Sequence, residues 1–139
     1  MRNFLVRLFV GVCLACAGVA HAQSQERISL GQLESMFRNI RANTTWNVDG
    51  NLLWGYFFFD PNPEKLQRVA DELKSSGYRV VGISPVPKRQ SYRLHVEKVE
   101  THTPSSLNDR NNDFYALADK QQLASYDGMD VGPVPASNK

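Results

Sequence analysis

The sequence predicts an α+β domain in which an antiparallel sheet carries helices on one face, with one extra helix before the first strand. Two observations lead to this class. Segments with apolar residues at spacings of three and four alternate with segments rich in aromatic and β-branched residues. After a leader, their order is helix, strand, helix, strand, strand, helix and a short final strand, which suits a two-layer sandwich.

The first 22 residues have the composition of a secretory signal. Arg2 and Arg7 lie near the amino end, an uncharged apolar run covers 8–19, and Ala-His-Ala occupies 20–22. The run is too short to span a bilayer of about 30 Å as a permanent helix, and small residues before the cut suit a signal peptidase. We expect cleavage after Ala22, a periplasmic or secreted protein, and no stable membrane anchor after cleavage. An uncleaved amino-terminal anchor is the alternative.

Both cysteines of the chain lie inside this leader, at Cys13 and Cys16. The residues before Cys16 match a lipoprotein cleavage box poorly. The mature chain of 139 minus 22, or 117, residues then has no thiol. This excludes thiolate catalysis, cysteine-ligated zinc and iron–sulfur clusters from the mature protein.

The charges of the mature chain balance. The full sequence has 16 Lys and Arg against 14 Asp and Glu, and loss of Arg2 and Arg7 with the leader leaves 14 against 14. A neutral chain lacks the electrostatic driving force that attracts proteins to a phosphate backbone. We therefore expect no nucleic-acid partner.

The first mature helix is expected at 29–42, after a flexible polar segment at 23–28. Ser29 and Gln32 form a capping-box pair at its start. Its apolar stripe, which we expect to pack in the core, consists of Leu30, Leu33, Phe37 and Ile40.

The segment 52–59 reads LLWGYFFF and predicts a strand. Side-chain alternation places four apolar residues on one face and three on the other, so we expect a central strand that is covered on both sides. The first set is Leu52, Trp54, Tyr56 and Phe58, and the second is Leu53, Phe57 and Phe59. Gly55 in the middle suggests a close approach by another backbone or ring.

A second helix follows, with Asn62 as its N-cap, Pro63 in its first turn and Gly77 at its end. The segment 78–83 predicts a strand, and a loop at 84–90 separates it from the next one.

The strand that begins near Tyr92 alternates apolar and polar residues, which predicts that one of its faces is buried. The alternation slips at Lys98-Val99, where we expect a bulge.

A last helix is expected from Thr103-Pro104 to about Gln122, and Asn111 lies within its apolar stripe. We expect this amide to be hydrogen-bonded in the core or to lie at the margin of the buried face. With a final strand near the carboxyl end, the element order is that of a ferredoxin-like sandwich over 29–133, followed by a flexible tail at 134–139.

The mature chain offers few residues for catalysis or metal binding. His95 and Glu97 share one face of a regular strand, whereas His102 falls on the opposite side. A zinc or hydrolytic site needs three converging ligands, so we expect neither a metal nor a cofactor. An envelope hydrolase that uses His95, Glu97 and Asp127 is the least favoured alternative.

Asp127 and Asp130 form a possible carboxylate pair near the carboxyl end, but Asp127-Gly128 is first of all a turn signal. The sequence contains no nucleophile elbow, phosphate-binding glycine loop or dinucleotide fingerprint. We therefore expect no catalytic residues and a protein that is not an enzyme.

The assembled pattern resembles the family of regulators of ribonuclease activity B, which are inhibitors of ribonuclease E. The resemblance covers roughly 50–133 and is carried by five short motifs. These are Leu53-Trp54-Gly55-Tyr56-Phe57-Phe58, then Leu66 to Leu73 with Gly77-Tyr78, Leu94-His95-Val96-Glu97-Lys98, the Thr103 to Ala118 helix with Arg110-Asn111, and Tyr126-Asp127-Gly128.

The resemblance implies a ferredoxin-like fold and inhibition by protein contact, without catalysis or cofactor. Two departures concern the partner: the ribonuclease of the family is cytoplasmic whereas this chain carries an export signal, and family members are acidic whereas this mature chain is neutral. The fold is compatible with a changed partner, because function depends on particular sites on the surface rather than on the fold itself.

The hypothesis is an exported steric inhibitor or immunity-type protein that binds another protein. Its expected partner-binding residues are Tyr126, Asp127, Asp130, His95 and Glu97. The alternative is a cytoplasmic inhibitor of ribonuclease E whose amino-terminal segment is not a signal.

Overall fold

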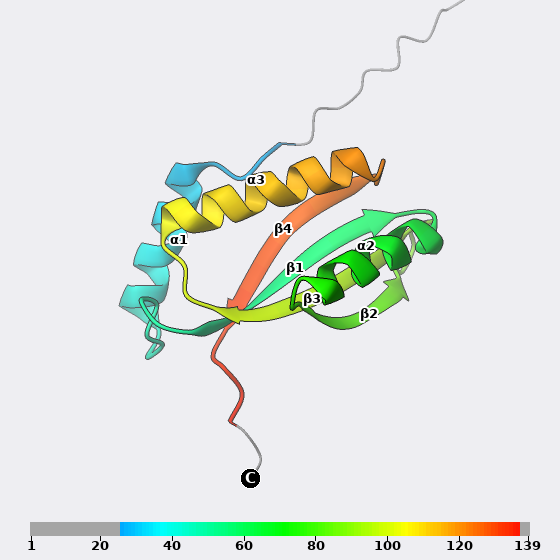
Figure 1. The fold of residues 1–139 in the computed structure, drawn as a ribbon. Coiled ribbons are helices and arrows are strands. Elements are labelled where there is room, and N and C mark those ends of the chain that lie inside the picture. The colour runs from blue at the N-terminus through cyan, green and yellow to red at the C-terminus, as the bar shows by residue number, and fades with distance from the viewer. Residues whose placement is uncertain (1–25, 137–139) are drawn as a thin grey trace, which may run out of the picture.

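The computed structural model describes residues 26–136, which form one antiparallel four-stranded sheet with three helices (Figure 1). The elements are, in order, α1 (Leu30–Asn43), β1 (Leu52–Asp60), α2 (Pro63–Ser75), β2 (Arg79–Pro85), β3 (Tyr92–Glu100), α3 (Pro104–Lys120) and β4 (Ser125–Gly132). The strand order is β2-β3-β1-β4, which is that of a ferredoxin-like sandwich. The predicted α+β class is confirmed.

The predicted leader at 1–22, with both cysteines, lies outside the described residues. Among the residues that are described, no helix has both the length and the apolar character needed to cross a membrane.

The helices lie on one face of the sheet, which we call the inner face. In Figure 1, α2 lies along β1, β3 and β2, while α3 lies along β4. Helix α1 packs beside α3 and reaches the sheet where the Phe37 ring stacks on Trp54, with 6.0 Å between ring centroids. The core therefore sits between the inner face and the helices. Its largest fully buried side chains include Trp54, Tyr56, Phe58, Leu66, Leu94, Leu107 and Tyr126.

No described helix lies on the opposite, outer face of the sheet. The expectation that β1 is covered on both sides is therefore wrong for this face, where Leu53, Phe57 and Phe59 are only half-buried. Neighbouring side chains shield these residues in part: the guanidinium carbon of Arg93 lies 5.6 Å from the centroid of the Phe57 ring. The apolar residues on both faces of β1 thus indicate a central strand, but not a second layer of helices on the outer face.

The helix starts agree with the local signals in the sequence. Ser29 and Gln32 make both hydrogen bonds of the capping box, and Asn62 accepts a hydrogen bond from the backbone of Glu64. Thr103 caps α3 through a second box with Ser106. These interactions satisfy backbone N–H groups that a helix start leaves unpaired.

The expected bulge at Lys98-Val99 is wrong, because β1 and β3 pair in one continuous register from Leu52 with Glu100 to Asp60 with Tyr92. Lys98 keeps its inner-face position, and its ammonium lies 4.8 Å from the centroid of the Tyr78 ring. Its long apolar stem lets the charged end reach the margin of the layer.

The irregularities lie in the outer strands instead: the pairing of β2 with β3 shifts between Val80 and Gly82, and that of β4 with β1 shifts between Tyr56 and Phe58. Gly128 has a φ of 97° there, a conformation that favours glycine. The sequence signal at Asp127-Gly128 is therefore a strand bulge rather than a turn.

Candidate partner-binding surface

Tyr126, one of the five expected partner-binding residues, lies beneath the surface on the inner face. Its side chain is completely buried, and its hydroxyl donates a hydrogen bond of 2.7 Å to Oδ1 of Asn111. Burial raises the pKa of the Tyr126 phenol. Tyr126 therefore supports β4 from below, and Asn111 takes the first of the two positions expected for it, a hydrogen-bonded amide in the core.

The other four residues follow the outer side of the sheet. Gly55 is flanked in register by Glu97 on β3 and by Asp130 on β4, and His95 lies on β3 beside them. Asp127 is exposed at the bulge of β4. The structure thus brings His95, Glu97 and Asp130 together on one face, while Asp127 lies at its edge.

Gly55 is the point on which two of these side chains converge. A Cβ atom at this position would lie 2.3 Å from Oδ1 of Asp130 and 2.8 Å from Nε2 of His95. The predicted close approach at Gly55 is therefore made by a carboxylate and an imidazole ring. A side chain here would push both groups away from the sheet.

His95 is held between an aromatic ring and a carboxylate. Its ring stacks on Phe57 with 4.6 Å between centroids, and its Nε2 lies 3.4 Å from Oε1 of Glu97. Glu97 also forms an ion pair with Arg79 of β2. Within the described part of the chain, Nε2 of His95 is buried and makes no hydrogen bond. The outer face thus combines aromatic rings with charges of both signs.

His95 and His102 lie on opposite sides of the sheet, as the alternation predicted. His102 is buried on the inner side, where its Nε2 lies 3.2 Å from the hydroxyl of Tyr56. Among residues 26–136, no group of three or more His, Cys, Asp or Glu side chains is placed to hold a metal ion. The described residues therefore provide no complete set of metal ligands for an envelope hydrolase.

Sequence reasoning missed a polar cluster on the inner side, between β3 and α3. Glu100 accepts two hydrogen bonds from the guanidinium of Arg110, of 2.7 and 2.9 Å, and one of 3.2 Å from the hydroxyl of Tyr56. Arg110 also donates to the hydroxyl of Tyr78. The side chains of Glu100 and Arg110 are only 13% and 22% exposed. We call this group, with His102, the Glu100 cluster.

Electrostatics within the Glu100 cluster favour the ionised carboxylate. Burial alone raises the pKa of Glu100, but hydrogen bonds from His102 and Arg110 and the positive charge of Arg110 outweigh it and hold this pKa well below its usual range. Burial also raises the pKa of Tyr78 to about 12. These buried, mutually satisfied groups anchor α3 to the sheet.

Comparison with known proteins identifies the family. The family model described as Regulator of ribonuclease activity B matches residues 32–131, whereas no curated protein matches the chain. The match covers most of α1 and β4 and all of the elements between them, including the Glu100 cluster. The chain therefore belongs to the family of regulators of ribonuclease activity B, whose members are regulatory proteins that act by binding another protein.

Proposed function

We propose that this protein is an exported, non-catalytic regulator that inhibits a partner protein by occupying its surface with the outer face of the sheet. The observation that carries the proposal is this face, which no described helix covers and on which half-buried Phe57 and Phe59 lie among Arg79, Arg93, Glu97 and Asp130. Export is proposed from the composition of 1–22.

The composition of the outer face suits a protein partner better than a nucleic acid. Aromatic side chains supply apolar contact area at low entropic cost, and arginine is enriched among residues that dominate binding energy. The carboxylate of Glu97 is paired with Arg79, and that of Asp130 lies on β4 beside Gly55, and both would repel a phosphate backbone. A partner with charges of both signs fits this pattern.

Inhibition of ribonuclease E in the cytoplasm is the second candidate, and the family match favours it. It requires that the amino-terminal segment is retained or has another role. The two candidates share the steric mechanism and differ in compartment and partner.

Cell fractionation separates the two candidates. We expect the protein in the periplasm or the medium, with a mass that lacks the first 22 residues, because 1–22 has the charge and apolar pattern that a signal peptidase processes. Intact-mass spectrometry of each fraction measures this. Full-length protein confined to the cytosol contradicts export and favours the second candidate.

Affinity capture with matched variants tests the surface. We expect wild-type protein to retain a partner from envelope extract that Asp130→Arg does not retain, because the substitution reverses a charge beside Gly55. Asp109→Arg, at an exposed position of α3, makes the same charge change on the helix layer and should retain the partner.

The retained protein is identified by mass spectrometry and tested again as a purified component. Loss of the partner from both variants, or from neither, assigns binding to another surface. Purified ribonuclease E that binds the wild type and loses activity supports the second candidate.

A further inference from the structure

We propose that the outer face also binds a second copy of this chain, forming a symmetric dimer in which two sheets pack face to face. The inference goes beyond the proposed function, since it needs no foreign partner. It rests on the order of residues across the outer face, because two copies of this face have complementary charges and apolar groups opposite each other.

Three cross-strand rows define that order. The row through Gly55 runs Arg79, Glu97, Gly55, Asp130 from β2 to β4. The row through Phe59 runs Ser84, Arg93, Phe59, Ser125. The row through Leu53 runs Val99, Leu53, Gly132 from β3 to β4. Arg79 and Arg93 thus lie on β2 and β3, with Glu97 of β3 paired to Arg79, while Asp130 lies on β4 and apolar side chains of β1 lie between.

Two copies can be placed with their outer faces together and related by a two-fold axis that runs parallel to the strands, midway between the sheets. Rotation about this axis puts each row opposite the same row of the second copy and reverses the order of the strands. It places β2 of one copy over β4 of the other, and β3 over β1. Arg79 then faces Asp130 of the second copy, and symmetry makes the same contact twice. The complementarity therefore follows from the row order alone.

The same operation pairs two further positions of the face favourably. Arg93 of one copy faces the Phe59 ring of the other, a pairing of a guanidinium with an aromatic face. Val99, which is 45% exposed, faces half-buried Leu53. Packed sheets are rotated by about 30° relative to each other, which displaces facing residues most at the corners of the interface. Contacts near the centre keep this pairing, and the arginine side chains are long enough to reach their partners at the corners.

The area of the face suits a reversible dimer. Four strands about 4.8 Å apart give the width of the sheet, and strands of about nine residues at about 3.4 Å each give its length. The projected area is then roughly 600 Å² per copy, and the uneven side-chain surface adds to it. The total is near the lower limit of about 1,200 Å² for specific interfaces. Because the dimer and the proposed partner use one face, the two would compete for it, and dissociation would precede partner binding.

Charge reversal provides the test, by sedimentation velocity over a range of concentrations, using the purified protein as cells produce it. We expect a concentration-dependent dimer for the wild type. Asp130→Arg and Arg79→Asp should each raise the dimer dissociation constant roughly tenfold or more, because each turns two attractions per dimer into two repulsions. High salt should weaken the wild-type dimer.

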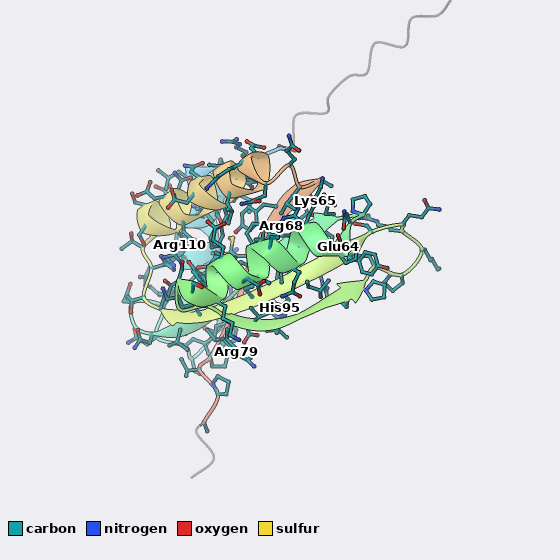
Figure 2. The ribbon with its side chains drawn as sticks, turned by 45° about the vertical axis from the view of Figure 1, so that its right-hand side comes forward. Glu64, Lys65, Arg68, Arg79, His95 and Arg110 are labelled. Carbon is teal, nitrogen blue, oxygen red and sulfur yellow. The ribbon has the colours of Figure 1, made fainter. Side chains whose placement is uncertain are left out.

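A mixture of the two single variants distinguishes dimer disruption from misfolding. In the mixed pair both charge contacts join opposite charges, so we expect a heterodimer to form from two variants that are monomeric alone. Arg68→Asp on α2 and Asp109→Arg on α3 are matched controls on the helix layer and should remain dimeric. Figure 2 labels Arg68 on α2, and Arg79 and His95 on the strands.

Two outcomes overturn the proposed dimer. A wild type that is monomeric at all concentrations leaves the outer face to another protein, as in the proposed function. A dimer whose dissociation constant is unchanged by charge reversal forms through another surface. Neither outcome depends on finding a partner, so failure of the dimer and failure of the proposed function are distinguishable.

Discussion

Replacing Tyr126 with alanine is expected to lower the free energy of unfolding by about 4 kcal/mol, the range for removing a large aromatic side chain from a core. Tyr126 is completely buried, and its ring lies 5.0 Å from Phe58, 5.4 Å from Phe114 and 5.1 Å from Tyr115, measured between centroids. The substitution removes one member of this aromatic cluster and leaves a cavity. Urea unfolding followed by circular dichroism measures the loss.

A milder substitution isolates the hydroxyl of Tyr126. Tyr126→Phe keeps the ring but leaves Oδ1 of buried Asn111 without its donor, and we expect a loss of about 1 to 2 kcal/mol. Asp130→Asn, at an exposed position of the same strand, should change stability by less than about 0.5 kcal/mol. If Tyr126→Ala were as stable as the wild type, Tyr126 would be a surface residue after all.

Much of the fold could be predicted because its signals are local. The capping pair of Ser29 and Gln32 and the Asn62-Pro63 start each act within one helical turn, so a single sequence is enough to detect them. Helical spacing also placed Asn111 among apolar residues, which limited it to the core or to the margin of the buried face. Element order then limited the topology to few choices.

The face to which Tyr126 belongs could not be predicted, because it depends on the bulge in β4. One extra residue in a strand changes which face the following side chains occupy. Gly128 signals positive φ but leaves open whether the chain turns or continues as a bulged strand. The structure shows that it continues, with Tyr126 inward and Asp130 outward.

The Glu100 cluster escaped detection for a different reason. Glu100 ends β3 and Arg110 lies within α3, so no periodicity of either element links them. Their contact, and that of Arg110 with Tyr78, arises only when α3 packs on the sheet. A charged residue at an inner strand position was the one local hint, since such a residue needs a partner.

Replacing Arg110 with methionine is expected to cost about 3 kcal/mol of unfolding free energy, because it removes the bidentate partner of the mostly buried Glu100 carboxylate. This is the low end of the range for breaking a buried ion pair, since the Lys98 ammonium at 3.4 Å and His102 at 3.3 Å remain beside the carboxylate. The double variant Arg110→Met, Glu100→Gln should recover part of this loss, since the carboxylate that has lost its main cation is then neutral. Arg68→Met, at an exposed position of α2, is the matched control and should have little effect. Equal losses in Arg110→Met and Arg68→Met would contradict a stabilising role for the cluster.

The acid dependence of stability should identify Glu100 as the group responsible. In the wild type the pKa of Glu100 is held well below its ordinary value of 4.5, so the unfolded chain binds more protons in acid than the folded chain. Its contribution is complete above about pH 5 and is lost progressively as the pH falls toward the folded pKa. Without Arg110, its hydrogen bonds and positive charge no longer lower this pKa, whereas the hydrogen bond and charge of His102 still do. The pKa should therefore rise from its wild-type position, and the slope of unfolding free energy against pH should flatten between about pH 3 and 5. Urea unfolding at several pH values measures the slope, and parallel curves for wild type and variant would show that Arg110 does not set the ionisation of Glu100.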